Sequence, residues 1–116
     1  MSVSTHVLDA TTGRPASGVQ VSLSWLDPLL GDADGEWVAV TDGETGADGR
    51  FGFGEPTGSG VYRLTFRTGE YFAARGVATF YPRVTIVFEV TDPGAREHVH
   101  VPLLLSPFGY STYRGS

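Results

Sequence analysis

Residues 97–105 read Glu97-His98-Val99-His100-Val101-Pro102-Leu103-Leu104-Leu105, and their alternation decides the fold class. A repeat of two is typical of a β-strand, in which successive side chains point to opposite faces of the sheet. One face is apolar and should lie in a core: Val99, Val101, Leu103 and Leu105. The other begins polar and ends apolar: His98, His100, Pro102 and Leu104. The apolar Leu104 on this second face also needs to be covered. Since each sheet of a sandwich has only one inner face, Leu104 predicts a subunit interface.

The rest of the chain also favours short strands. Runs rich in Val, Thr, Phe and Tyr predict strands near 4–9, 18–26, 36–42, 50–53, 61–67, 84–91 and 109–114, together with 97–105. Turn residues separate most of these runs, at 13–15, 31–35, 46–49, 58–60 and 92–94. Eight short strands predict an all-β protein, a two-sheet β-sandwich. Pro102 cannot donate a ladder hydrogen bond, so its nitrogen should face away from a neighbouring strand or lie at a bulge.

Residues 68–76 depart from the β pattern and predict one short helix. Thr68 is the expected N-cap, and Gly76 is the expected C′ residue that ends the helix. A helix of this length is unstable alone, so Tyr71 and Phe72 should dock it on the sandwich.

Composition limits the classes of protein and partner. A chain of 116 residues fits a single domain, 1–116, because a division would leave two marginal cores. The net charge of −5 gives no basic field for phosphates, so we expect neither nucleic acid nor a membrane as a partner. Cysteine is absent, which excludes disulfides and thiolate chemistry. The start of the chain lacks the regions of a secretory signal, so we expect a cytoplasmic protein.

The three histidines, His6, His98 and His100, are the candidates for acid–base work near pH 7. Each one taken singly also fits an ordinary strand residue paired to backbone or water. His98 and His100 share a face and could bind zinc with His6 as a third ligand. No Asp or Glu is spaced to orient such ligands, so we expect no metal and no cofactor. Arg50 follows a glycine-rich turn and, on composition alone, fits a solvated arginine at a strand end.

Longer motifs resemble a known family. The N-terminal part is Thr5-His6-Val7-Leu8-Asp9, followed by Thr12-Gly13-Arg14-Pro15-Ala16, and the central parts are Asp48-Gly49-Arg50 and Phe80-Tyr81-Pro82. The C-terminal part runs from His100-Val101-Pro102-Leu103-Leu104-Leu105-Ser106-Pro107-Phe108-Gly109 to the terminal Tyr113-Arg114-Gly115-Ser116. In this order they resemble the signatures of the transthyretin-like family of 5-hydroxyisourate hydrolases.

The resemblance implies a transthyretin-type sandwich that forms a homotetramer, a dimer of dimers, with active sites between subunits. It implies hydrolysis of 5-hydroxyisourate to 2-oxo-4-hydroxy-4-carboxy-5-ureidoimidazoline in urate breakdown, without a cofactor. By motif position the catalytic residues are His6, Arg50, His100 and Ser116, and the substrate-binding residues are His98, Tyr113, Arg114 and Gly115. The family often has His-Tyr-His where this chain has His98-Val99-His100. Because position 99 faces the core by parity, we expect this change to leave the chemistry intact.

These residues suggest a mechanism as a hypothesis. An imidazole, from His100 or His6, takes a proton from water, and the water attacks a ring carbonyl as the lactam C–N bond opens. Arg50 holds the anionic substrate and stabilises the oxyanion. Two alternatives are a small-ligand carrier in the manner of transthyretin, which the resemblance suggests, and a purely structural sandwich module. The resemblance favours the hydrolase, since the matching residues are of the enzyme type.

Overall fold

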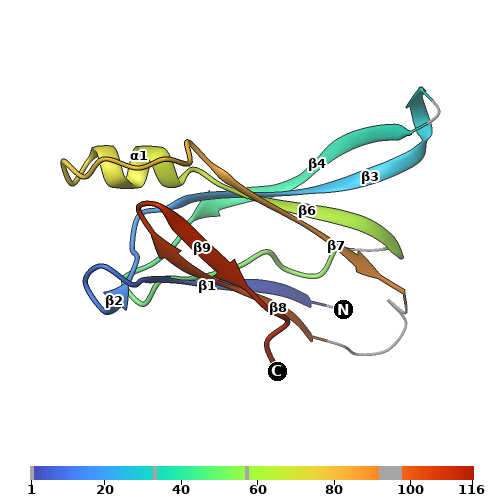
Figure 1. Cartoon of the computed structure of the whole chain (residues 1–116). Helices are drawn as coiled ribbons and strands as arrows, with labels where there is room; N and C mark the ends of the chain where they lie inside the picture. The colour runs from blue at the N-terminus through green and yellow to red at the C-terminus, as the bar shows by residue number, and fades with distance from the viewer. Residues whose placement is uncertain (1, 33, 57, 92–97) are drawn as a thin grey trace.

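The structure, a computed structural model, describes residues 2–32, 34–56, 58–91 and 98–116. Within these residues the chain forms nine strands and one helix. They are β1 (Ser2–Asp9), β2 (Arg14–Pro15), β3 (Gln20–Asp32), β4 (Gly35–Glu44), β5 (Arg50–Gly52), β6 (Gly60–Phe66), α1 (Thr68–Ala73), β7 (Val84–Val90), β8 (His98–Ser106) and β9 (Gly109–Thr112). Figure 1 shows the sheets as two layers, with α1 at one end and the β3–β4 hairpin projecting at the other. The two-sheet sandwich is therefore confirmed.

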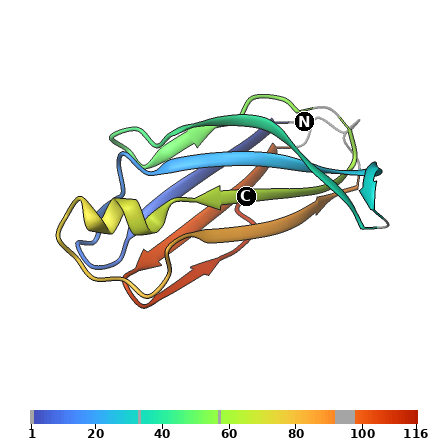
Figure 2. The same cartoon turned by 90° about the horizontal axis from the view of Figure 1, so that it is seen from above.

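The two sheets differ in strand order, and the first and last strands of the chain lie in the same sheet. One sheet has the order β2-β1-β8-β9, with β5 also paired to β1, and the other has the order β4-β3-β6-β7. The strands β1 and β8 are parallel, whereas every other described pair is antiparallel. Figure 2 shows β1 and β8 side by side, so the N-terminal strand lies directly beside a C-terminal one.

The largest differences from the predicted strands lie at β2 and in the β3–β4 hairpin. Arg14 and Pro15 were expected in a turn, but they form β2 and pair with Asp9 and Leu8 of β1. The turn before them is tight, with Gly13 at a φ of +70°, so the chain reverses early enough to resume pairing. The strands β3 and β4 also extend further towards each other than expected. The expected turn at 92–94, and residue 97, lie outside the described residues.

The predicted core face of β8 is confirmed. Its alternate residues Val99, Val101, Leu103 and Leu105 are buried between the sheets with the apolar residues of β6 and β7. The strand β1 alternates in the same way, with every second residue from Val3 buried and Ser2, Ser4, His6 and Leu8 half-buried on the outer face. The outer face of this sheet therefore carries polar side chains, Ser2, Ser4 and His6, that are only half-buried.

Pro102 lies where β9 stops pairing with β8. The last β8–β9 pair is Leu103 with Thr112, and the Thr112 hydroxyl donates to the Pro102 carbonyl over 2.7 Å. The nitrogen and carbonyl of one strand residue point to the same side, so the Pro102 nitrogen also faces the end of β9. The ladder with β1 therefore loses nothing, and the chain beyond Thr112 runs on alongside His100.

The helix α1 forms as predicted, except at its start. Thr68 is fully buried, and its hydroxyl donates to the Tyr81 carbonyl over 3.5 Å, so the prediction that it is the N-cap is wrong. The residue before the helix, Arg67, makes no side-chain cap. Gly76, at a φ of +67°, donates to the Ala73 carbonyl, and Val77 donates to the Phe72 carbonyl. These paired bonds form a Schellman motif with Gly76 as C′, which confirms the predicted end.

A buried hydrogen bond ties α1 to β1. Asp9 is buried at the end of β1, where it accepts a 2.8 Å hydrogen bond from the Tyr71 hydroxyl and two more from Thr11. Arg75 stacks on the other side, with its guanidinium carbon 3.7 Å from the centre of the Tyr71 ring. Tyr71 and Phe72 are both buried, so the predicted docking of the helix is confirmed. None of the helices in the described residues has the length and apolar character needed to cross a bilayer.

Candidate functional site

The outer face of β1 and β8 carries two histidines and two serines. Parallel pairing places Ser2 opposite His98 and Ser4 opposite His100. The Ser2 hydroxyl lies 2.5 Å from Nδ1 of His98. The Ser4 hydroxyl lies 2.7 Å from Nε2 of His98 and 2.8 Å from Nδ1 of His100. Hydrogen bonds to β1 therefore hold both rings, and they leave Nε2 of His100 available.

Arg50 enters this face from the opposite edge of β1. The antiparallel pairing of β5 with β1 places Arg50 directly opposite His6, so both side chains leave the same face. The preceding Gly49 has a φ of +76°, and a Cβ there would lie 2.4 Å from the Val7 carbonyl oxygen. Only glycine permits this approach, in which Val7 donates to the Gly49 carbonyl over 2.8 Å. The Asp48-Gly49 turn therefore fixes the position of Arg50 beside His6.

His6 lies between the two other elements, opposite Arg50 on one side and opposite Pro102 of β8 on the other. Its Nε2 is buried, and no group in the described part of the chain forms a hydrogen bond with it. A buried polar atom without a partner costs about 1–3 kcal/mol, and such atoms are rare in native proteins. The nitrogen is therefore suited to bind a water molecule or a ligand.

The electrostatic environment keeps His100 neutral. Burial lowers the pKa of His100 below its ordinary value of 6.5, because the charged imidazole loses its water. Electrostatic interactions with the nearby His98, Arg50 and His6 lower this pKa further. A neutral imidazole with one nitrogen available can accept a proton from water, which is the chemistry of a general base.

The C-terminal segment closes one side of His100. Gly115 donates its N–H to the His100 carbonyl over 2.8 Å, and the two residues form an isolated antiparallel bridge. A Cβ on Gly115 would lie 2.5 Å from Cδ2 of the His100 ring and 3.3 Å from Cγ of Pro102. The backbone of Gly115 thus packs directly against the His100 ring, and no larger residue fits there without moving it.

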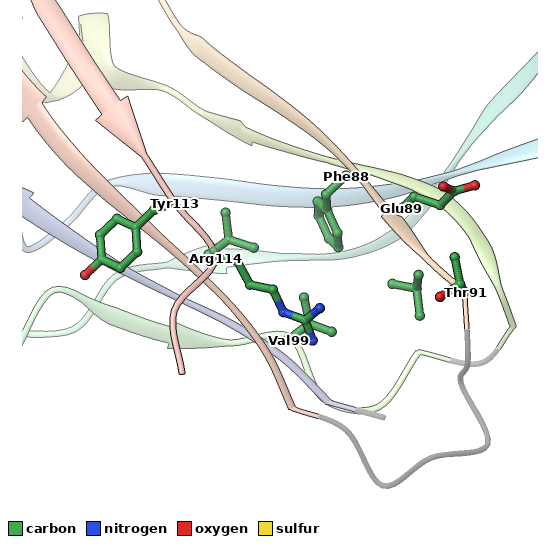
Figure 3. A pocket seen from close by; sticks show the side chains of 8 residues that line it. Phe88, Glu89, Thr91, Val99, Tyr113 and Arg114 are labelled. Atoms are coloured by element: carbon green, nitrogen blue, oxygen red, sulfur yellow. The ribbon is translucent and has the colours of Figure 1, made fainter.

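The other C-terminal residues do not all join this group. Since Gly115 shares the face of His100, alternation directs Arg114 to the opposite face of β8. Arg114 and Tyr113 line a cavity of about 140 Å³ at the edge between β7 and β8. Figure 3 shows Arg114 extending towards Val99 and Thr91, whereas the Tyr113 ring points away from them. Ser116 is exposed beyond Gly115.

In this single chain, five of the expected site residues therefore come together and three do not. Those on the common outer face are His6, Arg50, His98, His100 and Gly115. The cavity that Arg114 lines opens on the other side of β8 from the histidines.

Two site residues, Ser2 and Ser4, were missed by the sequence interpretation. The repeat of two in β1 already places positions 2 and 4 on the face of His6, which is the signal that could have found them. The parallel pairing that brings this face beside His98 and His100 is not readable from one sequence. These serines also contact both ring nitrogens of His98 and Nδ1 of His100. Among the described residues, no three His, Asp, Glu or Cys side chains are grouped to hold a metal ion.

Fold and site together define a β-sandwich with a histidine- and arginine-bearing site on the outer face of one sheet. Residues 3–115 match the model of the HIUase/Transthyretin family, and the chain belongs to this family. A 5-hydroxyisourate hydrolase of Salmonella dublin is 42% identical over 117 residues, which are 98% of this chain and 80% of the relative.

Solved structures agree with this assignment. A 5-hydroxyisourate hydrolase of Klebsiella pneumoniae is 41% identical, with a TM-score of 0.79, over 99% of this chain and 93% of that one. The transthyretin of Sparus aurata is 32% identical, with a TM-score of 0.86, over 97% of this chain and 95% of that one. The fold is thus equally compatible with both branches of the family, and the sequence is more similar to the hydrolase.

Proposed function

We infer that this chain is a 5-hydroxyisourate hydrolase, which opens the ring to give the carboxy- and ureido-substituted imidazoline. One observation carries the inference beyond sequence similarity: His6, Arg50 and His100 converge from three separate segments on one outer face. The buried Nε2 of His6 has no hydrogen-bond partner among the described residues, so this face is suited to bind a polar ligand. These three side chains lie outside the core, so their convergence does not contribute to the packing of the sandwich.

The proposed roles follow from the geometry of each group. His100 is the favoured base, because Ser4 engages its Nδ1 and its lowered pKa keeps the ring neutral at pH 7. His6 binds the attacking water or a carbonyl of the substrate through its unpaired Nε2. Arg50 holds the anionic substrate and stabilises the oxyanion with its planar set of donors. Within the described residues, no carboxylate forms an ion pair with Arg50.

A carrier of small ligands, in the manner of transthyretin, is the alternative within the same family. The backbone does not discriminate between the two functions, since its similarity to transthyretin is at least as high as that to the hydrolase. A carrier has no use for a neutral imidazole beside an arginine, whereas hydrolysis needs both a base and an oxyanion donor. The side chains therefore favour the enzyme.

We also propose that the chain assembles into a homotetramer whose active sites lie between subunits. The outer face of β8 runs from the histidines to the exposed Leu104, and the exposed aromatic side chains Phe80 and Phe108 lie at the adjacent β8–β9 turn. Phe80 and Phe108 are 72% and 71% exposed. Phe80 is held beside the β8–β9 turn because its N–H donates to the Pro107 carbonyl. Exposed apolar side chains grouped in this way are typical of subunit interfaces.

The roles are tested by the decay of 5-hydroxyisourate absorbance with His6→Ala, Arg50→Ala and His100→Ala, beside wild type and Arg83→Ala as a control on another surface. We expect each site variant to lose about 10²-fold or more of kcat/KM, because a base or an oxyanion donor contributes at least that much. Rates within a few-fold of wild type for all three would refute the assignment. Activity that survives a strong chelator argues against the zinc alternative.

A further inference from the structure

The Ser4 hydroxyl lies between the two histidines of the site and touches a nitrogen of each. Its oxygen is 2.7 Å from Nε2 of His98 and 2.8 Å from Nδ1 of His100. The Ser2 hydroxyl approaches the remaining nitrogen of His98, Nδ1, at 2.5 Å. Four side chains from two parallel strands thus form one continuous row of hydrogen bonds, from the half-buried His100 to the exposed His98.

Counting hydrogens restricts this row. A hydroxyl has one hydrogen and a neutral imidazole has one N–H, so Ser4 can donate to only one of the two rings. If every hydrogen is used, the row has two states. In one, all bonds point from Ser2 towards His100, which then carries its hydrogen on Nε2. In the other, all bonds point from His100 towards Ser2, and Nε2 of His100 keeps a lone pair.

We propose that Ser2, His98, Ser4 and His100 form a proton relay, in which Ser4 is the positioning residue that couples the tautomers of the two histidines. The proposal rests on the inferred hydrolase function, because that reaction supplies the proton. The resting state is the second one, in which His100 donates from Nδ1 to Ser4 and presents Nε2 to water. The burial of His100 and the positive charge of the nearby Arg50 favour passing a proton onwards rather than retaining it.

The reaction releases the proton that the relay would move. Water forms the new C–O bond while one of its O–H bonds breaks and Nε2 of His100 takes the hydrogen. The ring C–N bond then breaks, and the nitrogen that becomes the ureido group takes the second hydrogen of the water from the hydroxyl of the tetrahedral intermediate. The new carboxyl group is thereby left as a carboxylate, and the first hydrogen, now on His100, must leave the site as a proton in each turnover. His100 gives up its Nδ1 hydrogen to Ser4, Ser4 passes its own to Nε2 of His98, and Nδ1 of His98 releases one towards Ser2 and solvent. The row is then in its first state, and it returns to the second when solvent returns a proton at Nδ1 of His98 and Nε2 of His100 gives its hydrogen to water.

Kinetics of Ser4→Ala, with Ser4→Thr as the conservative variant, test the relay. We expect Ser4→Ala to lose about tenfold or more of kcat, as part of the roughly 10²–10⁴-fold that general-base catalysis supplies. Its KM should stay within about threefold, because substrate contacts are unchanged. Ser4→Thr keeps the hydroxyl and should recover most of kcat. Ser24→Ala, which removes a half-buried strand serine from the other sheet, is the matched control and should behave as wild type.

The tautomers give a readout that loss of structure alone does not mimic. In nitrogen-15 NMR of the resting enzyme, we expect His100 to carry its hydrogen on Nδ1 in wild type and Ser4→Thr, and to lose that preference in Ser4→Ala. If wild-type His100 carries its hydrogen on Nε2, or if Ser4→Ala retains both the wild-type tautomer and kcat, the relay is wrong. A wild-type protein that does not accelerate 5-hydroxyisourate decay overturns the hydrolase function itself, so the two failures are distinguishable.

Discussion

His6 and Arg50 lie directly opposite each other in the antiparallel pair of β1 and β5, although 43 positions separate them in the sequence. The pairing directs both side chains to the face that β8 extends with His100. Gly49 makes this possible, because a side chain there would meet the Val7 carbonyl. A base and an anion-binding group therefore reach one surface through backbone pairing alone, before any substrate is bound.

Replacing Arg50 by lysine tests whether the planar guanidinium is needed. Lysine keeps the positive charge but cannot bind two substrate oxygens in parallel, so we expect kcat/KM to fall by about tenfold or more. Arg83→Lys, an exposed arginine outside the site, is the matched control for the same chemical change. Steady-state rates that are equal for Arg50→Lys and wild type would mean that Arg50 acts only as a point charge.

The pKa of His100 should respond to Arg50. In wild type this pKa is lowered, by burial first and by electrostatic interactions with His98, Arg50 and His6 after it. The base works only when unprotonated, so activity should rise with pH through a midpoint below 6.5 and be lost at lower pH. Arg50→Gln removes one positive charge, and an NMR titration of the His100 ring should then show a higher pKa. An unchanged or lower pKa in that variant contradicts the arrangement.

Gly115 should be intolerant of even a methyl group. In Gly115→Ala the new Cβ would lie 2.5 Å from Cδ2 of the His100 ring, so the ring must move from the position in which Ser4 holds it. We expect about a tenfold or greater loss of kcat, because a misplaced base loses its orientation. Gly109→Ala is the control, since its Cβ would meet only the Ser106 hydroxyl at 3.6 Å. Equal rates for Gly115→Ala and Gly109→Ala would show that the C-terminal segment does not position His100.

The bond between Asp9 and Tyr71 should govern stability in alkali. Burial and the Asp9 carboxylate raise the pKa of Tyr71 from 10.0 to about 12. Since the folded state disfavours the ionised phenol, this contribution to stability is complete below pH 10 and is lost as the pH rises towards 12.

Urea unfolding at several pH values checks this expectation with Tyr71→Phe. The variant should be less stable at pH 7 by about 1–3 kcal/mol, because one oxygen of a buried carboxylate loses its donor. It should also lose less of its remaining stability between pH 10 and 12 than wild type does. Tyr110→Phe, a change on the exposed surface, should leave both quantities unchanged. A Tyr71→Phe protein as stable as wild type at pH 7 would show that the bond contributes little.

Alternation made most of the sandwich predictable. The two faces of β8, the docking of Tyr71 and Phe72 and the end of the helix at Gly76 all follow from local rules of side-chain direction and backbone freedom. Thr68 was misassigned, because the burial of its hydroxyl against the Tyr81 carbonyl is a tertiary contact. The short strand β2 was missed for a similar reason, since two residues pair only when a neighbouring strand is already in place.

The candidate site was predictable in its main residues through family motifs and not through local rules. Each histidine by itself fits an ordinary strand residue, and so does Arg50. The parallel pairing of β1 with β8 brings in Ser2 and Ser4, and this pairing joins segments more than 90 residues apart. A single sequence contains no local signal for such a contact. The position of Arg114 on the other face of β8 also depends on the bridge between His100 and Gly115.

The most direct measurement of the central claim is the rate at which the wild-type protein consumes freshly generated 5-hydroxyisourate present in large molar excess. A hydrolase predicts decay of absorbance well above the spontaneous rate, through many equivalents of substrate per chain, with the ureido carboxylate as the product. Decay at the spontaneous rate, or a signal that stops after one equivalent per site, would contradict the account and favour a carrier.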